Sequence, residues 1–330
     1  MDTPVDLHAY DRYVICVSGG KDSIASKIAL LDEGVDPERI EIWHQSVDGM
    51  ENTLDRYFDW PCTEGYVREI AAMFNLRLQW SWRAFGMSGE MHRQHERTKD
   101  VFYRYEGSDE RHHLPTTGGQ ESTRRKFPAK TIGTARWCSG YLKIQVAGRV
   151  LSDLSAFKGT KEEPFRILYV TGERAEESKN RSRYPRFAEH PSTSSVRTVH
   201  HYRPVLHWSE RRVWDVMQSW GILPHPAYYL GFPRVSCRSC IFLSPNQWAT
   251  LAEIHPDVID RIERDETDFQ FTLDNNVSIR QLVGAGTSMI DESNRHWIPL
   301  VQQDWRRPVL VAPDEWQMPK GAYGAEGGAI

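Results

Sequence analysis

The sequence predicts an α/β fold built on a parallel β-sheet, and three observations support this prediction. Residues 13–17 form a short, continuous apolar run that leads directly into a glycine-containing polar segment at residues 18–23. Apolar residues then recur at three- to four-residue spacing up to Gly34, as on one face of a helix that ends at a glycine. Strand and helix patterns alternate again further along the chain, which is typical of a parallel sheet covered by helices.

The later elements continue this alternation, apart from one interruption. Residues 84–133 carry scattered charge and glycine, and we expect an insertion or a mobile lid there. The remaining elements are a strand at 40–43, a helix at 67–74, a strand at 76–82, a helix at 138–151, a strand at 167–170 and a helix at 209–220.

The length of 330 residues is enough for roughly two domains at about 150 residues each. We expect an α/β unit over residues 1–245, which includes the insertion, and a mostly helical C-terminal extension over residues 246–330. Within the extension, the helical pattern is clearest up to Phe269, and the final stretch looks irregular.

The overall composition excludes several classes of protein. With 41 basic and 45 acidic residues the net charge is −4, so the chain as a whole is not basic enough to signal nucleic-acid binding. It has no apolar run near the length that a bilayer requires, and its first residues lack the features of a secretory signal. We therefore expect a cytoplasmic protein without a membrane partner. Five cysteines in a chain of this kind do not indicate a disulfide framework.

The polar segment after the first strand has the chemistry of a phosphate cradle. Glycines let the backbone turn sharply, and the helix that follows offers unpaired N–H groups to an anion. The segment is not a Walker loop, because Ile15 and Asp22 stand where that motif requires Gly and Ser or Thr. The alternative interpretation is a plain glycine turn between strand and helix. The residues are Ser18, Gly19, Gly20, Lys21, Asp22 and Ser23.

This S-G-G-K-D-S segment resembles the PP-loop of the ATP pyrophosphatase superfamily. The superfamily includes phosphoadenylyl-sulfate and adenylyl-sulfate reductases, tRNA thiolation enzymes and DNA phosphorothioation sulfurtransferases. The resemblance implies a Rossmann-like parallel sheet of the adenine nucleotide alpha hydrolase type, with helices on both faces. It also implies that residues 18–23 bind ATP with Mg²⁺, and that Lys21 stabilises charge while ATP is cleaved between its α and β phosphates.

Three further segments resemble the reductase-like branch of the superfamily, including its phosphorothioation and phage-type members. Asp48 and Gly49 stand where that branch has a motif near the adenosine. Lys143, in the segment R-W-C-S-G-Y-L-K, corresponds to a lysine that contacts phosphate or sulfate. Arg174 and Arg181, in G-E-R-A-E-E-S-K-N-R, correspond to arginines placed over the phosphates, and we expect both to be catalytic.

The position of Arg174 supports this role without the resemblance. It follows the carboxyl end of an apolar strand, where open α/β sheets bind ligands, and a guanidinium group matches the oxygens of a phosphate. The alternative for both arginines is a solvent-exposed helix start stabilised by Glu–Arg pairs.

Cysteine spacing indicates metal or thiol chemistry. Cys237 and Cys240 form a C-x-x-C pair, which is typical of half a metal site or a redox pair. By resemblance to adenylyl-sulfate reductases, Cys138 stands at a cluster cysteine, so the three cysteines would hold a [4Fe–4S] cluster with one open iron. Zinc on the same cysteines with a histidine such as His225 is the alternative.

The other cysteines bear on the fold and on the reaction. We expect Cys16 and Cys62 to be core residues, because buried cysteine commonly behaves as a small hydrophobe. Reductases of the family use a cysteine near their C-terminus, whereas this chain has none after Cys240, which disfavours thioredoxin-dependent reduction.

The combined prediction is an ATP-dependent enzyme that adenylates an acceptor, a DNA phosphate or a tRNA base, for thiolation. The sulfur would come from the cluster or from a partner cysteine desulfurase, and a homodimer is the expected assembly. The alternatives are a sulfonucleotide reductase that uses an external thiol, and a non-catalytic nucleotide-sensing subunit with a zinc staple. The candidate nucleic-acid face consists of residues 124–130, Arg197, Arg203, Arg211 and Arg212.

Overall fold

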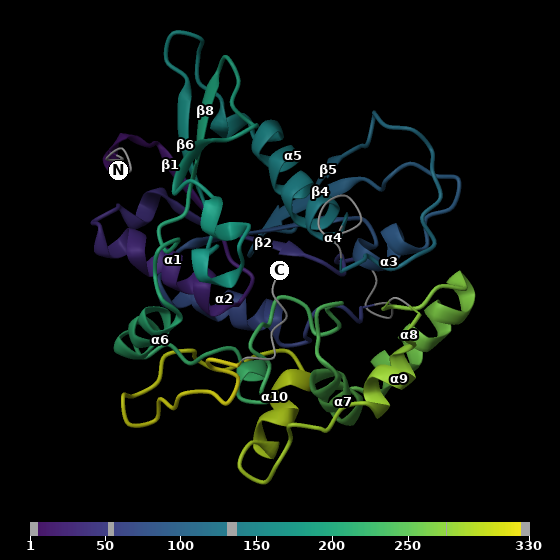
Figure 1. Cartoon of the computed structure of the whole chain (residues 1–330). Helices are drawn as coiled ribbons and strands as arrows, with labels where there is room; N and C mark the ends of the chain where they lie inside the picture. Colours follow the sequence, from purple (N-terminus) through teal and green to yellow (C-terminus); the bar gives the residue numbers. More distant parts are fainter. Residues whose placement is uncertain (1–5, 52–55, 131–136, 275, 325–330) are drawn as a thin grey trace.

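An eight-stranded sheet forms the centre of the computed structural model, which describes residues 6–51, 56–130, 137–274 and 276–324 (Figure 1). The order of the strands across the sheet is β5-β4-β3-β2-β1-β6-β8-β7. Their bounds are β1 Arg12–Cys16, β2 Ile40–Ser46, β3 Arg77–Arg83, β4 Val101–Tyr105, β5 His112–Leu114, β6 Phe165–Val170, β7 Phe187–Glu189 and β8 Arg197–Tyr202.

The five strands β3, β2, β1, β6 and β8 are parallel, as the sequence predicts, while both edges of the sheet are antiparallel. The expected lid over residues 84–133 is wrong in part. Its β4 and β5 extend the sheet beyond β3, and between β3 and β4 lies the short helix α3 (Gly86–Met91). The sheet is therefore mixed, and much of the insertion belongs to the α/β core.

Helices cover both faces of the sheet, as predicted (Figure 1). On one face, apolar residues of α1 (Lys21–Asp32) and α2 (Thr63–Met73) share a core with Tyr13 and Ile15 of β1. On the other face, α5 (Gln145–Asp153) shares a core with Val14. Successive residues of a strand point to opposite faces, so the continuous apolar run of β1 serves both cores. The helix α6 (Glu210–Ser219) packs against the outside of α1.

The helix predicted over residues 138–151 is divided into three parts. It starts as α4 (Trp137–Ser139), passes through a π-helical turn at Gly140–Ile144 and continues as α5. The N–H of Gln145 donates to the carbonyl of Gly140, five residues earlier, as a π turn requires.

Four helices follow in the C-terminal part of the chain, and Figure 1 shows them gathered beyond one end of the sheet. The single helical pattern expected up to Phe269 is two helices, because Pro256 cannot continue the first and begins the second. The four helices are α7 Pro245–Ile254, α8 Pro256–Phe269, α9 Ile279–Gly284 and α10 Ile298–Gln302.

The hydrophobic core runs across the predicted domain boundary at residue 245. Trp248, Ile259 and Trp305 belong to the same buried cluster as Ile15 of the sheet. The division of the chain into two units stays a prediction.

None of the described helices is both long enough and apolar enough to cross a bilayer. Short 3₁₀ helices lie at Leu7–Ala9, Pro37–Arg39, Ser155–Phe157, Ala175–Glu177, Arg181–Arg183, Pro226–Tyr228 and Arg295–Trp297.

Candidate functional site

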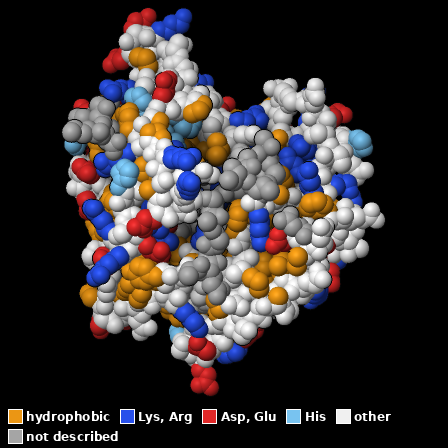
Figure 2. Space-filling view, viewed as in Figure 1, with side chains coloured by type: hydrophobic (Ala, Val, Ile, Leu, Met, Phe, Trp, Pro, Cys, Tyr) orange, Lys and Arg blue, Asp and Glu red, His pale blue; other side chains and the backbone are white. Residues whose placement is uncertain are grey.

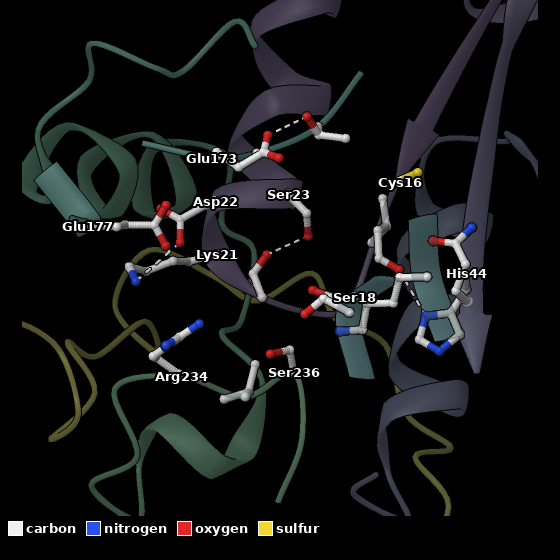
Figure 3. Close-up of a pocket in the computed structure, with 18 of the residues that line it drawn as sticks. Cys16, Ser18, Lys21, Asp22, Ser23, His44, Glu173, Glu177, Arg234 and Ser236 are labelled. Atoms are coloured by element: carbon white, nitrogen blue, oxygen red, sulfur yellow. Dashed lines mark hydrogen bonds and ion pairs between the residues drawn. The ribbon is translucent and has the colours of Figure 1, made fainter. Parts of the chain in front are cut away.

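A cavity of about 380 Å³ lies where the parallel strands β1, β2 and β6 end. Open α/β sheets bind ligands at this edge. The loop after β1 forms one part of the wall, and Figure 3 shows Arg234 and Ser236 across the cavity from Ser23 and Glu173. The lining includes Ser18, Gly20, Lys21, Asp22, Ser23, His44, Asp59, Lys143, Ile144, Glu173, Glu177, Arg181, Tyr184, Tyr228 and Arg234.

The loop between β1 and α1 has the geometry of an anion cradle. Gly19 adopts a positive φ of 78°, a conformation that side chains with a Cβ rarely adopt. Gly20 is the N-cap of the 12-residue helix α1 and provides no capping side chain. The N–H of Lys21 donates to the Tyr228 hydroxyl at 3.1 Å, and the Ser23 hydroxyl donates to the carbonyl of Gly20 at 2.7 Å. The helix N-terminus therefore faces the cavity with a partial positive charge.

Charged groups around the loop form a buried network. The ammonium of Lys21 lies 3.3 Å from a carboxylate oxygen of Asp22 and 3.5 Å from one of Glu210. Behind the loop, the Arg174 guanidinium lies 2.5 Å from the other oxygen of Asp22. Burial opposes ionisation, but the charges of Lys21 and Arg174 outweigh it and lower the pKa of Asp22. For Lys21, burial is likewise outweighed by Asp22, Tyr228 and Glu210, and its pKa is raised.

The predicted phosphate contacts do not all reach the cavity. Lys143, from the π turn, and Arg181, which forms an ion pair with Glu177, both line it. Arg174 does not line it, since its guanidinium is bound to Asp22 and to Glu176 at 2.8 Å. Gly19 does not line the cavity either, whereas Ser18 and Gly20 on both sides of it do.

Asp48 and Gly49 lie one layer away from the cavity that they were expected to line. The Asp48 carboxylate accepts hydrogen bonds from the backbone N–H groups of Phe58 at 3.1 Å and Asp59 at 2.8 Å. Burial raises the pKa of Asp48 to about 7. Asp59 does line the cavity, and burial raises its pKa to about 6. Asp48 therefore holds the segment that carries a cavity residue.

Sequence reasoning missed several cavity residues. Cys16 packs against the core, as expected, but it also lines the cavity and donates to the Tyr169 hydroxyl at 2.9 Å. Burial raises the pKa of Cys16 to about 12, so it is a thiol at neutral pH. Cys62 is fully buried, in agreement with the prediction. Tyr228 and Arg234 come from a segment without a recognisable motif, and their only signal is proximity to the C-x-x-C pair.

The three predicted metal ligands lie near one another. Burial raises the pKa of Cys237, and the neighbouring charges that act on it include Lys143, Cys240 and Cys138. Among the described residues, however, no group of three or more Cys, His, Asp or Glu side chains is arranged to hold a metal ion. The donor types fit a cluster, but the arrangement is not a closed set of ligands.

His225 does not join these cysteines as the zinc alternative requires. Its Nε2 lies 3.4 Å from the Cys62 sulfur and 3.3 Å from the Thr63 hydroxyl, and its Nδ1 accepts from the N–H of Ala227 at 3.3 Å. Both ring nitrogens are therefore occupied by other neighbours.

Most of the basic residues predicted to face nucleic acid are paired within the protein, and the nucleic-acid face stays a prediction. Arg124 lies between the rings of Trp137 and Tyr141, at 3.9 and 4.4 Å. Each of five basic residues has an oxygen partner within the protein. The partners are Glu90 at 3.6 Å for Arg124, Asp268 at 2.8 Å for Arg125, Asp274 at 2.5 Å for Lys130, the Ser192 carbonyl at 3.1 Å for Arg197 and Glu173 at 3.5 Å for Arg203. Arg211 and Arg212 are exposed on α6.

Curated relatives of the chain include two kinds of protein. An uncharacterised 37.8 kDa protein of Escherichia phage 186 is 30% identical over 138 residues, which are 42% of this chain and 38% of that protein. The adenosine 5'-phosphosulfate reductase of Burkholderia cepacia is 24% identical over 111 residues, 34% of this chain and 38% of the reductase. The corresponding enzyme of Neisseria meningitidis serogroup A is 33% identical over 72 residues, 22% of this chain and 28% of the reductase. The alignments thus span less than two fifths of each relative.

Among solved structures, the FMN adenylyltransferase of Candida glabrata in complex with FAD and inorganic pyrophosphate is similar with a TM-score of 0.38 and 12% identity, over 98% of this chain and 82% of that one. The phosphoadenosine phosphosulfate reductase domain matches residues 12–242, which hold all eight strands and every residue that lines the cavity. The chain therefore belongs to the phosphoadenosine phosphosulfate reductase domain family.

Proposed function

We propose that the protein is an ATP-dependent adenylating enzyme that activates an acceptor for sulfur transfer. The observation that carries this proposal is the single cavity in which the N-terminus of α1 meets Lys143 and Arg181. A helix N-terminus and two cations around one space match the oxygens of a polyphosphate. Membership of a family that acts on adenylyl nucleotides supports the choice of an adenine nucleotide.

In the proposed reaction, an acceptor oxygen attacks the α-phosphate of ATP, the bond from that phosphorus to the bridging oxygen breaks, and pyrophosphate leaves. The terminal sulfur of a donor persulfide, such as that of a cysteine desulfurase, then attacks the adenylated acceptor, and AMP leaves with the former acceptor oxygen. A second thiol cleaves the resulting disulfide, which releases the thiolated acceptor and leaves a disulfide between that thiol and the donor cysteine. Lys21, Lys143 and Arg181 would stabilise the negative charge on the phosphates. Lys21 is now paired with Asp22 and Glu210, so phosphate oxygens would compete with these carboxylates for it.

Arg174 and Asp22 have a supporting part in this proposal. Arg174 fixes the Asp22 carboxylate at the start of α1 and thereby holds the loop in shape. Asp22 lines the cavity and carries a carboxylate, the ligand type that Mg²⁺ prefers, but both of its oxygens are paired with Lys21 and Arg174, so Mg²⁺ would compete with these cations for it.

Cys138, Cys237 and Cys240 are the proposed ligands of a [4Fe–4S] cluster, which would supply an open iron able to hold sulfide. Because these thiols do not form a closed ligand set, the reaction above assigns no step to a cluster. Anaerobic purification followed by iron, sulfide and zinc analysis tests the assignment. Iron and sulfide that are lost in Cys237→Ala but kept in Cys62→Ala support it, whereas zinc without iron overturns it.

The adenylation test compares wild type, Lys21→Met and the matched control Lys161→Met, whose side chain is exposed and does not line the cavity. We expect calorimetry to show ATP binding that weakens at least tenfold in Lys21→Met and is unchanged in the control, because a charge-assisted contact to phosphate is lost. With tRNA or single-stranded DNA added, pyrophosphate release should follow the same order. ATP binding without pyrophosphate release would favour a nucleotide sensor.

A second candidate, favoured by the reductase relatives, is a sulfonucleotide reductase that uses an external thiol. It predicts sulfite release from an adenylyl sulfate in the presence of dithiothreitol and without ATP. Sulfite release combined with absence of ATP binding would replace the adenylating proposal.

A further inference from the structure

The loop after β6 carries basic side chains that the cavity does not use. Lys179 and Arg183 are exposed, and neither forms an ion pair with any residue that the structure describes. Arg181, between them, differs because it is paired with Glu177. Since the chain has a net charge of −4, these two cations are a local feature and not the result of a basic protein.

Aromatic rings alternate with guanidinium groups next to these cations. Tyr184 is 40% exposed, lines the cavity and has the Arg203 guanidinium 5.0 Å from its ring centre. Two further guanidinium groups lie near aromatic rings, with Arg186 5.3 Å from the ring centre of the buried Tyr202 and Arg212 4.0 Å from that of the half-buried Trp208.

The latter two pairs line a second cavity of about 350 Å³. Tyr184, which lines the first cavity, and Arg186, which lines the second, are two residues apart in the sequence. We refer to Lys179, Arg183, Tyr184, Arg186, Trp208 and Arg212 as the arginine–aromatic track. Figure 2 shows that Lys and Arg side chains lie next to hydrophobic ones in several places on the face that it views.

The track is suited to a chain of alternating phosphates and flat rings. Free cations attract phosphates, and exposed aromatic rings with a guanidinium behind them are stacking platforms for bases. In a duplex the faces of the bases are covered by their neighbours, whereas in a single strand they can stack on Tyr184. Asp32 and Glu33 form another part of the second cavity wall, which would repel phosphates toward the arginines.

We propose that the arginine–aromatic track binds a single-stranded segment of nucleic acid and directs one of its nucleotides into the cavity. This inference rests on the proposed function, since it names the class of acceptor that would be adenylated. It also replaces the face predicted from the sequence, of which only Arg212 belongs to the track itself.

The test measures fluorescence anisotropy of a labelled 20-nucleotide single strand, without ATP, over a series of salt concentrations. Lys179→Ala/Arg183→Ala should bind about tenfold more weakly or worse and with a smaller salt dependence, because it has lost two cations that displace counterions. Tyr184→Ala should lose about tenfold without changing the salt dependence, and Tyr184→Phe should restore binding, because stacking needs the ring and not the hydroxyl. Arg306→Ala is the matched control, since its side chain is 84% exposed and lies outside the track.

Three results would overturn the proposal: no binding by wild type, an equal loss in Arg306→Ala, or duplex bound as tightly as single strand with Tyr184→Ala at wild-type affinity. The assay also separates the two proposals. If ATP binds and the oligonucleotide does not, the track is refuted and adenylation stands. If the oligonucleotide binds along the track but ATP does not bind, the proposed function fails and the binding surface stands.

Discussion

Gly172, two residues after the end of β6, lies against the first turn of α1, and Gly172→Ala tests that contact. A Cβ added to this residue would lie 2.7 Å from both the carbonyl carbon and the carbonyl oxygen of Asp22, and 2.8 Å from the N–H nitrogen of Ser23. Ordinary contacts of a Cβ begin at 3.4 Å, so the first turn of α1 would have to move by about 0.7 Å. The atoms involved are backbone atoms, which cannot rotate away.

The cost should appear both in stability and in binding. Overpacking of this kind destabilises proteins by about 1–3 kcal/mol. A displacement approaching 1 Å at a site that orients a ligand can reduce its performance about a hundredfold. We therefore expect Gly172→Ala to lower the free energy of unfolding by about 1–3 kcal/mol and to weaken ATP binding by at least tenfold.

Urea denaturation and titration calorimetry measure the two effects. Gly118→Ala is the control, because a Cβ there meets no atom within 4 Å and its φ is not positive. Wild-type stability and ATP affinity in Gly172→Ala would show that the loop is not held against the end of β6, and the reasoning would fail.

Three other predictions follow from the buried charges. Burial raises the pKa of Asp48 from 3.8 to about 7, so the folded state favours the protonated carboxyl. The stability of wild type relative to Asp48→Asn should therefore be greatest below pH 4 and fall by up to about 4 kcal/mol as the pH rises to 7. Urea midpoints of both proteins at pH 5 and 8 check this, and parallel pH dependences would contradict it. In a double-mutant cycle, Arg174→Ala and Asp22→Asn should couple by about 1–3 kcal/mol in the free energy of unfolding, whereas additive effects would rule out the ion pair. Since the pKa of Cys16 is raised to about 12, mass spectrometry after iodoacetamide treatment at pH 8 should find Cys16 unmodified in the folded protein and modified in urea, and rapid labelling of the folded protein would refute its thiol state.

The parallel centre of the fold was predictable because each element has its own local pattern. The apolar run of β1 and the spacing of α1 need no distant partner to be recognised. The antiparallel edges were not predictable in this way. β5 and β7 have three residues each, which is too short to show an alternating pattern, although each pairs with the strand next to it in the sequence.

The candidate site was likewise predictable only in part. The loop, Lys143 and Arg181 stand in recognisable segments, and the structure brings them to one cavity. Asp48 was misplaced because the turn at Gly49, with a φ of 77°, is accompanied by hydrogen bonds that direct the carboxylate toward Phe58 and Asp59. Sequence spacing cannot tell whether a carboxylate at a strand end points into a site or into the backbone beside it.

The π turn at Gly140–Ile144 joins two parts of one helix that have different roles. The first part carries Cys138, and the second packs on the sheet. In an α-helix, residues five apart are rotated by about 140° around the axis, so Cys138 and Lys143 would face different directions. The hydrogen bond between residues five apart adds one residue to the turn and so reduces this difference in direction, and both groups act on the pKa of Cys237.

Beyond the turn, Val146 and Val150 keep the register that buries them against the sheet. The extra residue of the π turn thus sets the direction of the side chains in α4 relative to those in α5. Removing one residue from the turn would leave the buried face of α5 in place and swing the thiol of Cys138 about 100° away from its neighbours.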